Sequence, residues 1–455
     1  MKKVRNFKFF SLGCILAIAL ILIGVHVLQA QMKTQAKGGK PKPPPPPPIE
    51  LPCNNNEVCE ISEVDDSLLL EEQPCPDCAP KDYAPLNTIL PGTQIISKAY
   101  GLGNFLQFQY VEGEYIDTWA SQPLLLQDYF VADIDNDNIK EIVAVSNTVF
   151  SNDAKKKKDL VRWSQQKIHI YRHGNQGTPD YTSGWYGSIE EGGISWIILA
   201  DADGDGIENE LIWRRDDKFE IHRWNGADFM FVWASVPYPD LFMGVDVGDV
   251  DGEGANEIVA GTNHGQVLVI EHLGGNNWGE ALYTEEVTAQ GPFTDHMYID
   301  YVCVADVDND GVSNEIVAGG SNARIMVWKY NVDTEAYETA CVSEPFEGFT
   351  EQGSVGDFDG DGTNEIVFLA KDSGIYISDL VPSGEGSEYP YNLGFVSFLE
   401  VENYPYKIFA EDSDNDGWDE VLYYNIDVGG VILDYDGFNL TQTIASAYLY
   451  HPIVK

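Results

Sequence analysis

The sequence predicts an all-β fold, a closed β-propeller of seven blades with four antiparallel strands in each blade. Three observations predict it. An acidic motif occurs six times, with copies that begin at Asp133, Asp201, Asp249, Asp306, Asp357 and Asp412. Short β-rich runs flank the copies, and a pattern of aromatic residues follows most of them. A period of about 50 residues in a β-rich chain is typical of propeller blades or a solenoid.

The acidic motif has acids at its first, third and fifth positions and closes on Glu at the ninth or tenth. It reads D-x-D-x-D-G-x-x-E in its fullest form. We expect cation ligands from all six copies: Asp133, Asp135, Asp137, Glu141; Asp201, Asp203, Asp205, Asn209, Glu210; Asp249, Asp251, Glu253, Glu257; Asp306, Asp308, Asp310, Asn314, Glu315; Asp357, Asp359, Asp361, Glu365; and Asp412, Asp414, Asp416, Glu420.

The residues around each acidic loop favour strands over helices. A short apolar or alternating run precedes the loop, as in residues 196–200 and 301–305. A β-branched pair, usually within Glu-Ile-Val, follows most copies. An EF-hand would instead place amphipathic helices on both sides of a twelve-residue loop. Each acidic loop is therefore predicted to join two strands in a hairpin.

A second repeat predicts an outer hairpin whose aromatic side chains pack between neighbouring sheets. The same spacing relates two sets of residues: Tyr110, Tyr115 and Trp119, and Trp224, Phe229 and Trp233. One such hairpin lies in residues 88–122 without an acidic loop, and one follows each loop, which gives seven. The count of hairpins alone is also compatible with six or eight blades. Residues 448–455 are expected to add a strand that closes the ring against the first blade.

Two cysteines fall within one predicted blade. Cys341 takes a position held elsewhere by Trp, and Cys303 lies on the inner strand, three strand spacings away. That separation is about 14 Å, which is beyond the reach of a disulfide. Both are predicted to be buried thiols.

The acidic loop between strands, at this period, resembles the FG-GAP/VCBS repeat family. That family includes the seven-bladed propeller of integrin α subunits and many bacterial and archaeal surface proteins. The resemblance covers roughly 370 of the 455 residues. Neither Phe-Gly nor Gly-Ala-Pro nor Arg-Gly-Asp occurs in the sequence, so the match is to the bacterial type of repeat. The resemblance implies that the loops bind calcium. The role expected for the metal is structural, because protein ligands saturate each loop.

The loop chemistry itself also points to calcium. Carboxylates at positions 1, 3 and 5 lie inside a tight turn, Gly at position 6 permits the bend, and the closing acid completes a shell of hard oxygen ligands. We expect up to six Ca²⁺ ions. Asn138 replaces the Gly of the first copy, and the longer Glu253 side chain can crowd the third site. In the second and fourth copies Asn209 and Asn314 stand at position 9. The alternative is a set of solvated Asp-Gly turns, but six such loops without cations would repel themselves.

The N-terminal region predicts export. Residues 1–30 have a basic head and a long apolar run, which fits a cleaved signal peptide or a retained membrane anchor. Either one places the rest of the chain outside the cytoplasm, secreted or anchored to the cell surface. Residues 31–52 form a Lys/Pro-rich linker with six consecutive prolines, Pro43–Pro48, which act as a stalk or a plain spacer.

Residues 53–84 form an acidic segment that contains Cys53, Cys59, Cys75 and Cys78. Their spacing does not match a standard zinc finger, and an exported segment is oxidised. Two disulfides are therefore favoured over a zinc site. The propeller is assigned to residues 85–455.

The charge of the chain limits its partners. With 73 acidic and 27 basic residues the net charge is −46, which excludes free nucleic acid as a partner and limits membrane contact to the N-terminal segment. G-x-S-x-G, H-E-x-x-H and phosphate-binding glycine loops are absent, so no enzyme is predicted. His169 and His173 are expected to form a solvent-facing pair on one strand.

These observations favour an adhesion or ligand-binding module with a protein or glycan partner at the cell surface. A polysaccharide-acting lyase or hydrolase on a propeller, or a sugar-binding lectin, is the alternative. The basic run Lys155–Lys158 is either a solvated loop tip or a contact for an acidic partner, and Asn439 begins a glycosylation sequon. The acids outside the loops also fit a halophilic host.

Overall fold

The computed structural model describes residues 84–86, 94–98, 105–111, 114–151, 162–186, 194–215, 217–238, 244–284, 298–350, 352–370, 374–401, 405–412, 416–425, 429–435, 440–446 and 450–454. Residues 80–455 form one compact unit. The predicted export segment 1–30, the linker 31–52, the four cysteines between 53 and 78, the run Lys155–Lys158 and Asn439 lie outside the described residues.

The described part of the chain contains strands and no helix, so the predicted all-β class is confirmed. Its strands form seven four-stranded antiparallel sheets. One sheet has the order β28 (Tyr450–Val454), β1 (Gln94–Lys98), β2 (Phe105–Val111), β3 (Glu114–Ala120). The next two contain β4 (Leu126–Ala132), β5 (Glu141–Ser151), β6 (Arg162–Tyr171), β7 (Tyr181–Thr182), and β8 (Ile194–Ala200), β9 (Glu210–Arg215), β10 (Lys218–Trp224), β11 (Phe229–Ala234).

The remaining four sheets also follow chain order. Two of them contain β12 (Val245–Gly248), β13 (Glu257–Gly261), β14 (Val267–His272), β15 (Trp278–Tyr283), and β16 (Ile299–Ala305), β17 (Glu315–Gly320), β18 (Ile325–Asn331), β19 (Ala336–Val342). The last two contain β20 (Gln352–Gly356), β21 (Glu365–Ala370), β22 (Gly374–Pro382), β23 (Tyr391–Leu399), and β24 (Pro405–Glu411), β25 (Glu420–Asn425), β26 (Gly429–Tyr435), β27 (Leu440–Ser446).

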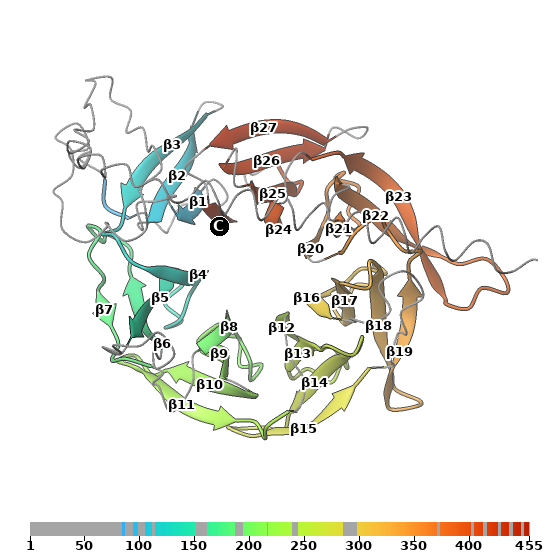
Figure 1. Ribbon diagram of the computed structural model, residues 1–455, viewed down its shortest axis with the longest axis horizontal. Helices are drawn as coiled ribbons and strands as arrows, with labels where there is room; N and C mark the ends of the chain where they lie inside the picture. Colours follow the sequence, from blue (N-terminus) through green and yellow to red (C-terminus); the bar gives the residue numbers. More distant parts are fainter. Residues whose placement is uncertain are drawn as a thin grey trace, which may run out of the picture. The chain divides into compact units, whose positions relative to one another are not determined.

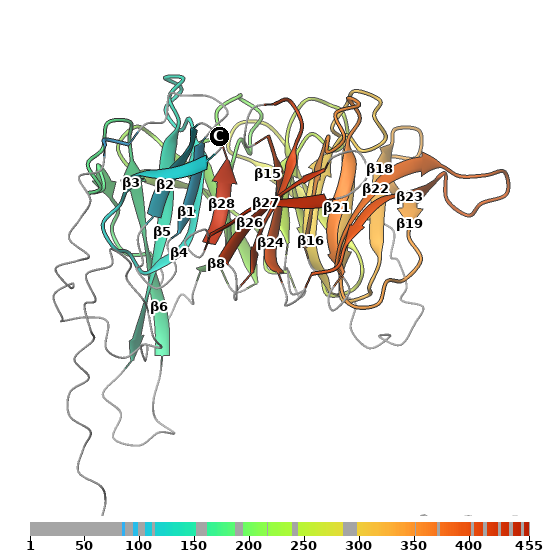
Figure 2. The same ribbon diagram turned by 90° about the horizontal axis from the view of Figure 1, so that it is seen from above.

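The sheets stand around a common axis, which is the arrangement of a β-propeller. Figure 1 shows β8, β12, β16 and β20 nearest the axis and β11, β15, β19 and β23 at the rim. Figure 2 shows the same sheets from the side, with the strands running between the two faces of the disc. Each sheet twists because every strand twists to the right, and this twist lets small sheets pack radially. The predicted propeller architecture is therefore confirmed.

The two ends of the described chain meet in one sheet. β28 pairs with β1, with Ile95 opposite Val454 and Ile96 opposite Ile453. This is the closing strand expected from residues 448–455. The pairing supplies a backbone partner for β1, which would otherwise be a sheet edge.

The core lies between consecutive sheets. Six clusters of buried apolar residues each join side chains of two neighbouring sheets. At one such boundary Trp233 of β11 packs against Trp278 of β15 with ring centroids 5.6 Å apart. At another, Tyr181 meets Trp224 at 5.0 Å. Burial of one large apolar side chain contributes about 1.5–3 kcal/mol, so the predicted aromatic packing between sheets helps to hold neighbouring sheets together.

The two cysteines of the β16–β19 sheet lie in one row across it. Cys303 pairs with Val317, Val317 with Val327, and Val327 with Cys341. Both are free thiols, as the strand spacing predicts. Cys341 is fully buried, whereas Cys303 on the innermost strand is only partly buried. The prediction of two buried thiols is thus wrong for Cys303, because its strand is not covered by another strand on its inner side.

The histidine prediction is also wrong. His169 lies inside the β4–β7 sheet and is buried, with its ring nitrogens 2.9 Å from Ser146 Oγ and 3.1 Å from Thr182 Oγ1. Burial, and then the nearby Lys167, lowers the pKa of His169 to about 4. His173 is exposed because β6 ends at Tyr171 and the chain turns there. The two residues therefore do not share a strand face.

Candidate metal sites

Each acidic motif forms the turn between the first and second strands of its sheet, as predicted. We name these turns by their residues: loop 133–141, loop 201–210, loop 249–257, loop 306–315, loop 357–365 and loop 412–420. They connect β4 to β5, β8 to β9, β12 to β13, β16 to β17, β20 to β21 and β24 to β25.

The first Asp of each loop fixes the turn. In loop 357–365 the Gly362 N–H donates to Asp357 Oδ2 at 3.0 Å. The equivalent bond, from the N–H at position 6 to the first Asp, occurs in all six loops at 2.7–3.0 Å. Gly362 has φ of +84°, and Asn138, which replaces Gly in the first loop, has +64°. The turn therefore needs the left-handed conformation that Gly and Asn tolerate.

The closing Glu turns inward and is buried. In loop 357–365 the Glu365 side chain is 1% exposed, and its Oε2 accepts the Phe358 N–H at 2.9 Å. The same hydrogen bond, from the N–H at position 2 to the closing Glu, recurs in loops 133–141, 201–210, 249–257 and 306–315. Each carboxylate thus stabilises its own turn and keeps its other oxygen near the acids of the loop.

The loop acids converge. In loop 357–365 one oxygen from each of Asp357, Asp359, Asp361 and Glu365 lies within 4.8 Å of the others. Three-residue groups meet the same limit in four other loops: Asp133, Asp135 and Glu141; Asp201, Asp203 and Glu210; Asp249, Asp251 and Glu257; and Asp306, Asp308 and Asp310. Glu253 is exposed, and Asp414 lies outside the described residues.

The position before the closing Glu often contacts the preceding loop. The Asn256 side chain donates to the Asp201 carbonyl at 2.7 Å, and that of Asn364 donates to the Asp306 carbonyl at 2.8 Å. Asp419 accepts the Asp357 N–H through Oδ2 at 2.9 Å. Asn209 and Asn314, which the sequence suggests as cation ligands, occupy this same position in their loops. Their Oδ1 atoms are buried without a hydrogen-bond partner.

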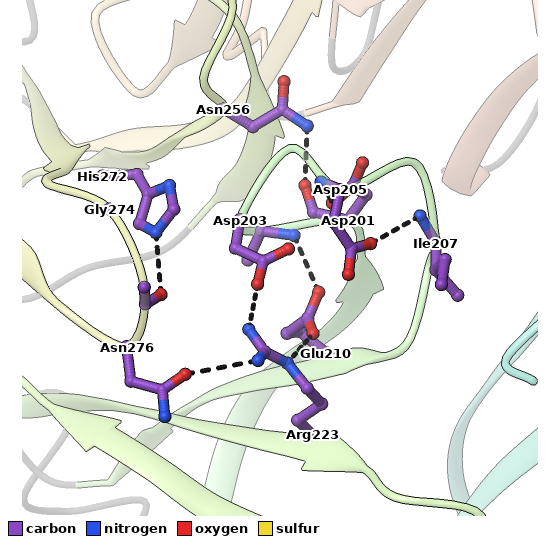
Figure 3. A network of polar contacts seen from close by, with 12 residues as sticks. Asp201, Asp203, Asp205, Ile207, Glu210, Arg223, Asn256, His272, Gly274 and Asn276 are labelled. Carbon is purple, nitrogen blue, oxygen red and sulfur yellow. Dashed lines mark hydrogen bonds and ion pairs between the residues drawn. The ribbon is translucent and has the colours of Figure 1, made fainter.

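Basic side chains that the motif does not reveal enter three of the loops. Figure 3 shows the Arg223 guanidinium between Asp203 and Glu210. The Lys329 ammonium lies 2.8 Å from Asp308, 2.8 Å from Asp310 and 2.7 Å from Glu315. Arg172 lies 3.5 Å from Asp135. All three come from the third strand of the sheet or its end, so the second hairpin, not the loop itself, supplies the positive charge.

Burial raises the pKa of the closing acids. It raises the pKa of Glu257 to about 8, with Asp251 adding to the effect, and that of Glu365 to about 8. The pKa values of Glu141 and Glu210 rise to about 7, again chiefly through burial. A cation placed among these acids favours the ionised form and reverses the shift.

The residues present fit a hard divalent cation. The converging donors are oxygen atoms, and Asp249 Oδ1 and Asp357 Oδ1 are buried with no hydrogen-bond partner among the described residues. A buried polar atom without a partner is costly, and a metal–oxygen bond would satisfy it. Carboxylate-rich oxygen sites suit Ca²⁺ better than softer metals.

The comparisons with known proteins find structural neighbours but no family. No family model matches the sequence, and no curated protein matches it. Among solved structures, it is similar to U3-55K (TM-score 0.47, 11% identity, 76% of this chain and 90% of that chain). It is also similar to the WD40 repeats of RRP9 (0.46, 11%, 76% and 88%) and to BBS1N in complex with ARL6DN (0.44, 9%, 81% and 89%). In the described residues no helix is long and apolar enough to cross a membrane.

Proposed function

We propose that this protein is an extracytoplasmic β-propeller that binds Ca²⁺ in its acidic loops and presents a ligand-binding surface at or outside the cell surface. The metal has a structural role, and the partner is a protein or a glycan. The repeat is proposed to be of the FG-GAP/VCBS type, on the strength of the motif and its period.

The convergence of four acids in loop 357–365 carries the calcium proposal. Asp357, Asp359, Asp361 and Glu365 point oxygens to one place, and Asp357 Oδ1 is buried there without a donor. One oxygen of each of these four acids accepts an N–H of the turn. The second oxygen of each acid is not needed to shape the loop, and a cation is the partner that suits it.

The structural role of the metal follows from the position of its ligands in the chain. They all lie in one hairpin, while Asn256, Asn364 and Asp419 connect neighbouring loops through hydrogen bonds. A metal that orders one hairpin therefore also orders its contact with the next sheet. Catalysis by the metal would need an open coordination position, and a loop that surrounds the ion with its own oxygen ligands leaves none.

Thermal unfolding with and without chelator tests the calcium proposal. A ligand that binds only the folded state stabilises it by about 2.7 kcal/mol per site at 100 times Kd, so we expect a large fall in Tm in excess chelator. Added Ca²⁺ should restore the Tm and equal Mg²⁺ should not. A matched control is Glu385→Gln, which removes an exposed acid outside the loops and should keep the full response. An unchanged Tm in chelator would overturn the proposal.

The predicted export segment and the proline-rich linker support the ligand-binding role. A glycan array with and without Ca²⁺, run beside turnover assays on acidic polysaccharides, tests it. Calcium-dependent binding without turnover supports the proposal. Turnover would favour the enzyme alternative, and neither binding nor turnover would favour a purely structural surface protein.

We also propose that the seven four-stranded sheets act as the seven blades of one closed ring. The pairing of β28 with β1 supports this count, because it joins strands from the two ends of the chain in one sheet. A chain that ends at Ser446 lacks β28, and we expect it to have a lower Tm than the full chain. An equal Tm would contradict ring closure by β28.

A further inference from the structure

One position on the third strand of each sheet decides what faces the closing Glu. In the β8–β11 sheet Glu210 pairs with Arg223, and in the β16–β19 sheet Glu315 pairs with Lys329. In the β12–β15 sheet the adjacent pair is Ile258 with Ile270, so the same register brings Glu271 beside Glu257. In the β4–β7 sheet Ile142 pairs with Tyr171, which brings Arg172 beside Glu141. The same position therefore carries a basic residue in three sheets and an acidic residue in a fourth.

The β20–β23 sheet repeats the acidic arrangement. Ile366 pairs with Ser378, which brings Asp379 beside Glu365. Asp359 and Asp361 raise the pKa of Asp379, in addition to the larger effect of burial, so this side chain lies in the field of the loop acids. The pKa of Glu271 shows the same influence from Asp251 and Glu253, again after burial. Loops 249–257 and 357–365 thus receive an additional acid where two other loops receive a cation.

The two basic side chains occupy the place of a metal ion. Lys329 Nζ contacts three carboxylates of loop 306–315 at 2.7–2.8 Å and is 28% exposed. Arg223 contacts Asp203 and the fully buried Glu210, and its third nitrogen donates to Asn276 Oδ1 at 3.2 Å (Figure 3). A calcium ion in either loop would have to displace these contacts and lie beside a positive charge.

A second difference between the loops agrees with the first. In loops 201–210 and 306–315 Oδ1 of the first Asp accepts the N–H at position 5, at 3.0 and 3.1 Å. In loops 249–257 and 357–365 that N–H donates to the acid at position 3, at 2.8 and 3.2 Å. In loop 306–315 it reaches position 3 as a second, longer contact, to Asp308 Oδ1 at 3.3 Å. Among the described residues, Oδ1 of the first Asp is then left buried without a hydrogen-bond partner in loops 249–257 and 357–365. Carboxylate oxygens without a hydrogen-bond partner in loops 201–210 and 306–315 lie at other positions, Asp203 Oδ1 and Glu315 Oε1, and the latter is 2.7 Å from the Lys329 ammonium.

We propose that Arg223 and Lys329 are built-in cations, which replace calcium in loops 201–210 and 306–315, and that loops 249–257 and 357–365 take the metal. This inference rests on the proposed calcium binding and sharpens it from six equivalent sites to two classes. The acidic motif alone does not separate the classes, because all four loops have converging acids.

Loop 133–141 belongs to neither class. The Arg172 side chain is 36% exposed and reaches Asp135 of this loop at 3.5 Å. Such a contact is weak in solvent, so it does not prevent metal binding. With two of six loops closed to metal, the protein binds no more than four calcium ions.

Native mass spectrometry of the full-length protein, stripped of metal and returned to Ca²⁺, counts the bound ions. We expect no more than four in the wild type. Lys329→Met and Arg223→Met should each bind one more ion than the wild type. Asp379→Lys places a cation at the register position of Lys329 and should bind one fewer. Lys218→Met, on β10 at the end of the sheet away from the loop, is the matched control and should bind the wild-type number.

The outcomes separate this inference from the calcium proposal. Six ions in the wild type, or no gain in folded Lys329→Met and Arg223→Met, overturn the inference and leave calcium binding intact. No bound calcium in any variant overturns both. If the Met variants fail to fold, Asp379→Lys decides, because it adds an internal cation, and an unchanged ion count there contradicts the inference.

Discussion

Loops 306–315 and 357–365 lie in neighbouring sheets and have nearly the same turn. Each has acids at positions 1, 3 and 5, a left-handed Gly at position 6, and a buried closing Glu that accepts the N–H at position 2. They differ in the third strand, where Lys329 enters the first loop and Asp379 lies beside Glu365 in the second. The comparison teaches that the motif specifies a turn, whereas the charge of the side chain beside the closing Glu is set by another strand.

The separation of these two roles has a physical reason. The bonds from the position 2 N–H to the closing Glu and from the position 6 N–H to the first Asp occur in both loops, so they do not depend on which side chain faces the acids. The net charge of the site depends on side chains that the second hairpin brings in. A single substitution on that hairpin can therefore change the net charge of the site without changing the turn.

The largest expected effect is that of Lys329→Met in the absence of calcium. The change leaves Asp308, Asp310 and the buried Glu315 without their shared cation. Removing one partner of a buried ion pair costs about 3–5 kcal/mol. Because Lys329 is 28% exposed, we expect a smaller loss of unfolding free energy, about 2–3 kcal/mol. Urea denaturation in chelator measures it.

Calcium should rescue this variant. Millimolar Ca²⁺ takes the place of the ammonium, so the difference from the wild type should shrink when unfolding is measured with calcium. Lys218→Met should show neither the loss nor the rescue. An equal loss with and without calcium would show that Lys329 contributes packing and not charge.

A second prediction concerns the pH dependence of the calcium-free protein. The folded-state pKa values of Glu257 and Glu365 are raised to about 8, above about 4.3 for an unfolded Glu. Between these values the folded state binds more protons, so stability falls as pH rises. We expect the free energy of unfolding to fall steadily from pH 5 to pH 8.

The calcium-loaded protein should not show this fall, because the metal keeps the same carboxylates ionised in the folded state. Urea unfolding at pH 5, 6.5 and 8, on metal-free and loaded protein, makes the comparison. A metal-free protein that is most stable at pH 8 would contradict the assignment of these two acids to cation sites.

A third prediction tests the additional acid directly. Asp379→Asn keeps the size of the side chain and removes one negative charge beside loop 357–365. Calcium affinity depends on the number of charges at a site, so we expect about a tenfold loss at this loop. Calorimetric titration of the stripped protein measures it. Asp333→Asn, at an exposed turn between β18 and β19, is the matched control, and an equal loss there would mean that only overall charge matters.

Much of this molecule could be predicted from local spacing. The six acidic turns, their strand flanks, the aromatic packing between sheets and the closing strand follow from a pattern with a propeller-like period. Lys329 and Arg223 could not be found this way. Each is separated from its closing Glu by the whole second strand and the turn after it. A one-residue change of register there would turn the side chain to the other face of the sheet.

Two other features were not predicted correctly for the same reason, because they depend on residues that are far apart in the sequence. Arg172 is still farther from Glu141 along the chain, because the hairpin of β5 and β6 is long. The sequence places His169 in solvent, but its ring is buried between the Ser146 hydroxyl of β5 and the Thr182 hydroxyl of β7, which the local spacing does not show. A useful signal would have been the charge of the third-strand residue expected opposite each closing Glu.

The smallest expected effect concerns the bond that joins the two compared loops. Asn364 of loop 357–365 donates through its side chain to the Asp306 carbonyl of loop 306–315 at 2.8 Å. Asn364→Ala removes that donor and should cost about 1 kcal/mol of unfolding free energy. Its backbone N–H still donates to Asn309 Oδ1, at 2.7 Å, so Asn309→Ala tests the second contact separately.

If the link is only a hydrogen bond between turns, each loss of unfolding free energy is the same with and without calcium. A loss that disappears in chelator would instead mean that the contact forms only when loop 357–365 holds its metal, and the two loops would then be coupled despite their different sources of positive charge.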